Sequence, residues 1–184
     1  MIKKTLPLMA APVGLIPGGY VATAYMDATE VLTQEVTVTV EKTAGWAVTL
    51  RWKAPKPVKA IGNEPGAFVD ACAILSAAGA DAMWMTMGAV DNPVEGILWR
   101  PDREKPTRIT AKGLGTVVRG EPDAGWRVAA AWAGGQWEVR YDLGAWAPFE
   151  KTKLVAVAIW QGDKKQRAGL KSVTMDWLRL EGLI

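Results

Sequence analysis

The sequence predicts an all-β fold, a two-sheet antiparallel β-sandwich with a long loop insertion. Apolar and polar residues alternate in short segments, as in EVTVTVEK at 35–42, which is the pattern of half-buried strands. Gly and Pro cluster between these segments, as is typical of sandwiches. The composition, with 49% hydrophobic and 22% charged residues among 184, indicates one globular domain with a sizeable core.

The strand pattern recurs along the chain past residue 30, and turn signals separate the strands. A Gly-Gly pair at 134–135 divides the longest apolar segment, which predicts a hairpin there. The segment 101–125 is a long polar loop, for which short strands and a contact surface are the two alternatives. In chain order, the predicted strands occupy 30–42, 45–53, 66–76, 81–88, 95–101, 125–143, 152–163 and 171–182.

Residues 1–24 have the layout of a signal peptide, and residues 25–184 form the predicted domain. Lys3 and Lys4 precede a moderately apolar stretch, and Ala22-Thr23-Ala24 offers a small-residue cleavage site. Pro and Gly interrupt that stretch, so an uncleaved anchor and an ordered N-terminal arm are the alternatives. We expect export. Cleavage would remove two lysines and no acids, lowering the net charge from +3 to +1, which gives no reason to expect nucleic-acid binding.

The composition excludes several kinds of site. The chain has no histidine, which excludes His-based acid–base catalysis and the commonest ligand of zinc and haem iron. Cys72 is the only cysteine, so there is no internal disulfide, iron–sulfur cluster or covalent haem attachment. Its apolar neighbours predict an inert core thiol.

Two segments carry unusual side chains on predicted strand faces. In KSVTMDW, alternation places Lys171 on the apolar face with Val173, Met175 and Trp177. Lys171 either extends its amine to water, or is desolvated and neutral, with a lone pair that can bind a metal. In MWMTM, the alternating methionines Met83, Met85 and Met87 either fill a soft core or supply a thioether ligand.

Two blocks of the sequence resemble the haem b-binding gamma subunits of the ethylbenzene dehydrogenase group, which includes dimethylsulfide dehydrogenase, chlorate reductase and selenate reductase. The first block has Met87-Gly88 ahead of Pro93-Val94 and Trp99. The second has Ile159-Trp160 ahead of Gly169-Leu170-Lys171-Ser172. The resemblance extends from about residue 30 to the end, and the second block is the more specific. The chain is shorter than the group would lead us to expect, and its loop between Met87 and Trp99 differs.

The resemblance implies one non-covalent haem b with Met87 and Lys171 as axial ligands. Met83 and Met85 are rival ligands, because the choice of Met87 depends on the family pattern. Ser172 and Trp160 belong to the matching C-terminal block and are candidate haem-binding residues. Haem propionates need cations or backbone donors. Arg167, Lys164 and Lys165 beside the ligand loop are candidates for this role, with a solvated turn as the alternative.

The implied function is electron transfer in a periplasmic complex. The resemblance implies a non-catalytic cytochrome b-type subunit. Its partners would be a molybdopterin-containing catalytic subunit, an iron–sulfur subunit and a soluble periplasmic electron carrier. Contact with the membrane is expected only if the leader is retained. The alternative from another class is an exported carbohydrate-binding β-sandwich module. It predicts two or three of the ten tryptophans exposed along a groove. A structural module without a ligand explains the composition but neither motif.

Overall fold

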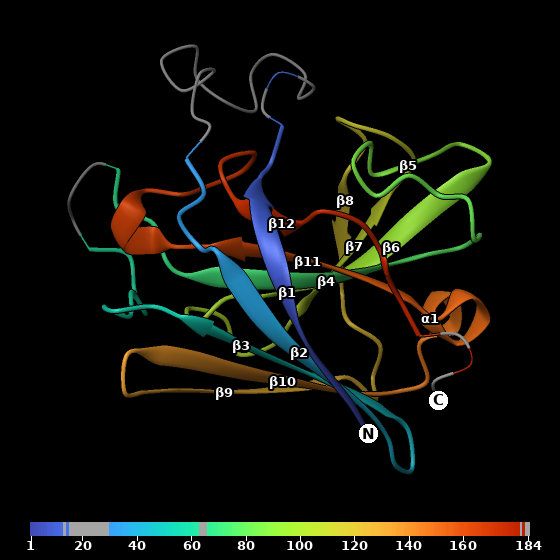
Figure 1. Ribbon diagram of the computed structural model, residues 1–184, viewed down its shortest axis with the longest axis horizontal. Coiled ribbons are helices and arrows are strands. Elements are labelled where there is room, and N and C mark those ends of the chain that lie inside the picture. The colour runs from blue at the N-terminus through green and yellow to red at the C-terminus, as the bar shows by residue number, and fades with distance from the viewer. Residues whose placement is uncertain (13, 15–29, 63–65, 181, 183–184) are drawn as a thin grey trace.

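The computed structural model describes residues 1–12, 14, 30–62, 66–180 and 182, and it confirms the all-β prediction (Figure 1). Strands dominate, and the described part has one short α-helix, α1 (Ala147–Thr152), and a 3₁₀ turn at Gly162–Lys164. The strands are β1 (Ile2–Ala10), β2 (Glu35–Lys42), β3 (Trp46–Lys53), β4 (Ala71–Ala77), β5 (Gly88–Ala89), β6 (Asn92–Trp99), β7 (Thr107–Ala111), β8 (Val118–Gly120), β9 (Arg127–Ala133), β10 (Gln136–Gly144), β11 (Leu154–Trp160), β12 (Ser172–Thr174) and β13 (Leu178–Arg179).

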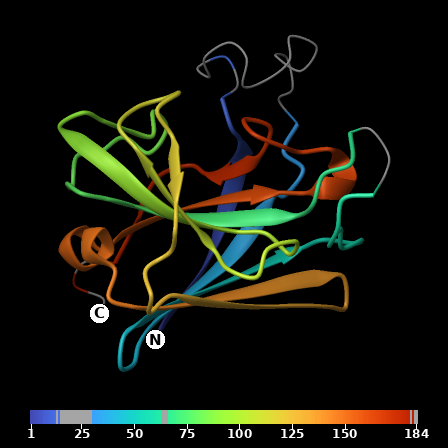
Figure 2. The same cartoon turned by 180° about the vertical axis from the view of Figure 1, so that it is seen from behind.

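All strand pairs described are antiparallel, and the two layers of the predicted sandwich belong to one sheet that folds over on itself. The order is β8-β7-β6-β4-β11-β12-β1-β2-β3-β10-β9, with β13 beside β11 and β5 beside β6. Strand β1 joins the two halves, because Ile2–Pro7 pairs with β2 and Leu8–Ala10 pairs with β12. Figures 1 and 2 show β4 and β11 crossing β1 and β2 in both views.

The main core lies between the two halves of the sheet. Val38 and Leu50 from β2 and β3 are buried in the same cluster as Ile74 and Val157 from β4 and β11. Cys72 is buried here too, and its Sγ lies 3.1 Å from the hydroxyl of Tyr141. Burial raises the pKa of the Cys72 thiol, which confirms the predicted inert core cysteine.

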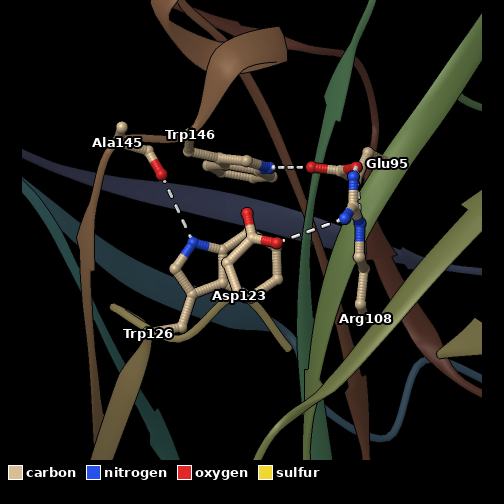
Figure 3. A network of polar contacts seen from close by, with 6 residues as sticks. All are labelled: Glu95, Arg108, Asp123, Trp126, Ala145 and Trp146. Atoms are coloured by element: carbon tan, nitrogen blue, oxygen red, sulfur yellow. Dashed lines mark hydrogen bonds and ion pairs between the residues drawn. The ribbon is translucent and has the colours of Figure 1, made fainter. Parts of the chain in front are cut away.

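A polar network joins two tryptophans of this core, Trp126 and Trp146, to charged side chains (Figure 3). Glu95 of β6 accepts a hydrogen bond from Nε1 of Trp146 (3.0 Å) and pairs with Arg108 of β7. Arg108 also donates to Asp123 (3.2 Å), and the hydrogen bond with Glu95 raises the pKa of its guanidinium. Trp126, just before β9, donates to the carbonyl of Ala145 (3.3 Å). The network thus joins β6 and β7 to the loops that flank β9 and β10.

A second apolar cluster lies on the outer face of β4, β6, β11 and β12. Many of its strand residues are small: Ala73 and Ala77 of β4 and Ala156 and Ala158 of β11 are buried there with Val173 of β12, beside the larger Leu75 and Leu154. Ala73 is directly opposite Ala158 in the sheet. Loops cover this face instead of a second sheet, so the alanines leave room between strands and loops.

The structure confirms some of the other expected elements and corrects the rest. The predicted hairpin at 134–135 is present, and both glycines have the positive φ that its turn requires. The 101–125 segment contains short strands, β7 and β8. Residues 81–87 contain no strand and consist mostly of turns, so this predicted strand was wrong. The last predicted strand is split into β12 and β13, and Met175 between them is 58% exposed and not on an apolar face.

The N-terminal predictions are placed only in part. Ile2–Ala10 forms β1, whereas the cleavage site at Ala22–Ala24 lies outside the described residues. Within the described part of the chain, no helix has the length and apolar character needed to cross a membrane.

Candidate ligand cavity

A cavity of about 270 Å³ lies on the outer face of the sheet, over the second apolar cluster. Strands supply Ala71, Leu98 and Trp160 to its wall, and loops supply Met87 and Lys171. The two candidate ligands are 84 positions apart in the sequence, yet the fold brings both to one cavity.

A smaller cavity of about 60 Å³ adjoins it. Met87, Leu114 and Lys171 line both cavities, so this pair of candidate ligands lies where the two meet. The wall of the smaller cavity includes Ala156 and Ala158. The small side chains of β11 therefore form part of the floor beneath Met87 and Lys171.

Lys171 is held by its backbone at the start of β12. Its carbonyl accepts a hydrogen bond from the amide of Ala11 (2.9 Å), and its side chain lies on the same sheet face as Val173. The residue is half-buried, and Nζ lies 5.0 Å from the ring centroid of Trp160. Among the described residues, none forms an ion pair or hydrogen bond with Nζ.

Desolvation lowers the pKa of the Lys171 amine from 10.5 to about 8. A lowered pKa brings the neutral form of the amine within reach nearer to physiological pH, and a neutral amine has the lone pair that a metal ligand needs. Because the side chain faces a cavity and not bulk water, the reading in which Lys171 extends freely into solvent is disfavoured.

Met87 comes from a turn, and not from the strand face that the alternation indicated. Its amide donates to the carbonyl of Trp84 (3.0 Å), and its carbonyl accepts from Gly113 (3.0 Å). Its φ is 58°, in the left-handed region, and that of Gly88 is 77°. A Cβ on Gly88 would approach the Asn92 carbonyl to 2.6 Å, so the position after Met87 requires glycine.

The three methionines of this segment are not equivalent. Met87 lines both cavities, and Met85 lines only the smaller one. Met83 is 64% exposed and contributes to neither wall. Of the three, Met87 alone lines both cavities together with Lys171, which favours it over its rivals as the candidate thioether ligand.

Some of the other predicted site residues line the larger cavity, and the rest lie outside it. Trp160 and Arg167 line the larger cavity, with Nε1 of Trp160 donating to the Ala168 carbonyl (3.0 Å). Ser172 faces the opposite side of β12, where its buried Oγ accepts a hydrogen bond from the Thr33 amide (3.1 Å). Lys164 and Lys165 are exposed and outside the cavity wall, which matches the alternative of a solvated turn.

Sequence reasoning missed two cations. Arg100, just after β6, and Arg119, in β8, join Arg167 in the wall of the larger cavity. Arg100 is paired with Asp102 through Nη2 (2.7 Å). These arginines come from segments that no motif connects, so only the folded topology brings them together.

The donor atoms suit a haem iron better than a free metal ion. The described residues contain no group of three or more acidic, cysteine or histidine side chains that would hold an ion. The cavity instead offers one thioether, one amine of lowered pKa, apolar walls and arginines. Methionine is a known haem ligand, and arginines pair with carboxylates such as propionates. The residues present therefore fit haem b.

The fold and the cavity together define a class: an all-β protein with a methionine and a lysine facing one loop-covered cavity. Comparison with known proteins agrees with the group named above. The chain is 33% identical to chlorate reductase subunit gamma of Ideonella dechloratans in an alignment of 102 residues that covers 51% of this chain and 42% of that subunit. The match thus spans less than half of the relative's length. No family model matches the chain.

Proposed function

We propose that this chain binds one haem b between Met87 and Lys171 and serves as the electron-transfer subunit of a multi-subunit oxidoreductase. The observation that carries the proposal is the junction of the two cavities, which both side chains line. Similarity to a subunit of chlorate reductase supports it independently.

Each residue type in the cavity has a role in this proposal. Met87 and Lys171 would hold the iron, the alanines of β4 and β11 would leave room for a flat ring, and Trp160 would pack at its edge. Bound haem b supplies a one-electron couple between ferric and ferrous iron. If Met87 and Lys171 both held the iron, no protein-free position would be left for oxygen, so the site would suit electron transfer and not oxygen chemistry.

The proposed location and partners of the subunit depend on the same resemblance. We propose an exported, periplasmic subunit that does not itself catalyse a substrate reaction. Its proposed partners are a molybdopterin-containing catalytic subunit and an iron–sulfur subunit. Electrons would pass between the iron–sulfur subunit and a soluble periplasmic carrier.

The carbohydrate-binding alternative has less support. It needs tryptophans exposed along a groove. All ten tryptophans belong to the described part of the chain, and none of them is exposed. Seven are buried, and Trp84, Trp132 and Trp160 are half-buried. Trp84 and Trp160 line the two cavities instead.

An absorption spectrum of the purified protein tests the haem proposal, recorded oxidised and then reduced with dithionite, with a pyridine haemochromogen assay. We expect sharp low-spin bands on reduction and about one haem b per chain. Lys171→Ala should keep the fold but change the spectrum and weaken haem retention. A colourless protein that takes up no added haemin would refute the proposal, and an unchanged Lys171→Ala spectrum would refute the lysine ligand.

A further inference from the structure

The two adjoining cavities differ in charge. The larger one has Arg100, Arg119 and Arg167 in its wall, and none of the described residues that line it is acidic. In the wall of the smaller one, Lys171 is the only charged residue among those described, and it lies at the junction. Apart from Lys171 at the junction itself, a ligand that spans the two cavities therefore meets cationic side chains of the described residues only in the larger one.

The arginines reach the larger cavity from separate parts of the fold. Arg119 pairs in register with Ile109, which lines the same cavity, so both lie on the cavity side of the β7–β8 ladder. Arg167 lies between Lys165, whose carbonyl accepts from its Nη1 (3.1 Å), and Phe68, whose ring centroid is 4.8 Å from its Cζ. Arg100 and Arg119 also border a neighbouring polar groove, so this end of the cavity is open to water.

The availability of these cations differs. Arg100 already has a carboxylate partner in Asp102, with hydrogen bonds of 2.9 and 2.7 Å. Arg119 is exposed and has no acidic partner among the described residues. Its guanidinium thus has donors for an incoming carboxylate. Burying a carboxylate without a cation is costly, whereas charge-assisted hydrogen bonds to a guanidinium are strong.

We propose that the carboxylates of the bound tetrapyrrole lie in the larger cavity, held by Arg119 and Arg167, and that its uncharged edge occupies the smaller cavity beside Trp84 and Met85. This inference rests on the proposed haem function. It fixes which end of the ring faces the polar groove and which faces the alanine floor. Arg119 is then a specificity residue, since it selects a ligand that carries carboxylates.

The test compares haemin with haemin dimethyl ester, whose propionates are uncharged. Each is titrated into apoprotein and followed by Soret absorbance. We expect the unmodified protein to bind haemin at least about tenfold more tightly than the ester, because the ester lacks the carboxylates that form charge-assisted hydrogen bonds with the guanidinium groups. Arg119→Gln should reduce this preference several-fold, and the double variant with Arg167→Gln should remove it. In each variant the ester should bind as it does in the unmodified protein.

Arg103→Gln is the matched control, because Arg103 is exposed and borders the polar groove but not the cavity. It should keep the full preference for haemin. The inference is overturned if the unmodified protein binds both ligands equally, or if the double variant keeps the preference. If neither ligand produces a low-spin spectrum, the haem proposal itself fails. Arg119 is an exposed edge-strand residue, so its replacement should leave the melting temperature unchanged.

Discussion

Lys171 shows how strongly one side chain depends on its surroundings. Sequence pattern placed an ammonium group on an apolar strand face, where a neutral amine and a solvated one were both open readings. The structure puts Nζ against the Trp160 ring, and desolvation lowers the pKa of the amine to about 8. Desolvation of the ammonium form destabilises the folded, ligand-free protein. Lys171 therefore has a measurable effect on the free energy of unfolding.

The pH dependence of that effect has a definite sign. Between about pH 8 and pH 10.5 the unfolded chain holds a proton on Lys171 that the folded chain has released. The free energy of unfolding of the apoprotein should therefore rise with pH across this window. Urea denaturation at several pH values measures it. Lys171→Met should lose this part of the slope. Equal slopes for the two proteins would show that the folded amine keeps its ordinary pKa.

Met87 is the second residue whose role can be separated from that of its neighbours. Met87→Ala should change the spectrum of the haem-loaded protein, because the thioether at the cavity junction is lost. Met83→Ala is the control, since Met83 is exposed and outside both cavities. Absorption spectra of the reduced proteins distinguish the two. A spectral change in the Met83 variant alone would identify Met83, and not Met87, as the ligand.

At the level of elements, the sequence predicted most strands but not the cavity. Strands with clean alternation, such as β2 and β3, and the Gly134-Gly135 hairpin follow from local pattern. The methionine segment misled the prediction, because period-two spacing also occurs in turns and nothing local signals the positive φ of Met87. Arg100 and Arg119 were missed because convergence on a cavity depends on pairings among β6, β7 and β8 that local sequence does not encode.

The alanine floor can be tested without touching a proposed ligand. Ala158→Leu adds three carbon atoms beneath the cavity junction, where Ala158 lines the smaller cavity. We expect the apoprotein to fold, with a melting temperature changed by only a few degrees, but to retain much less haem. Haem content after gel filtration is the measurement. Ala131→Leu, at an exposed position of β9, should retain haem normally. Equal retention in both variants would exclude this floor as part of the site.

The polar network around Glu95 makes a separate prediction about the core. The Glu95 side chain is 11% exposed, and its removal leaves the Trp146 N–H and the Arg108 guanidinium without their shared acceptor. We expect Glu95→Ala to lower the free energy of unfolding by about 2–4 kcal/mol. Glu138→Ala breaks a surface pair with Arg51 at a side chain 45% exposed, and should cost less than about 1 kcal/mol. Urea denaturation of both variants compares the two, and equal costs would contradict the structural role of the network.

Across the whole molecule, β1 is the element on which the two halves of the sheet depend. It forms six residue pairs with β2 and three with β12, and Leu8 is buried in the main core. The cavity lies beside the β12 end of this junction, where the amide of Ala11 bonds to the carbonyl of Lys171. Residues 2–10 thus have two incompatible roles: the sequence predicts that they are removed with a leader, whereas the structure pairs them as a strand of the sheet.

A chain that starts at residue 25 tests which of these two roles residues 2–10 have. Without β1, the facing edges of β2 and β12 lose their backbone partners and Lys171 loses its contact with Ala11, so we expect this variant to unfold at a melting temperature at least about 10 °C lower. The full chain is the control, and thermal unfolding followed by circular dichroism is the measurement. Haem retention should fall with it, because the start of β12 positions Lys171. If the shortened chain melts with the full chain and holds haem equally well, β1 is dispensable. A mature protein cleaved near Ala24 would then be the functional form.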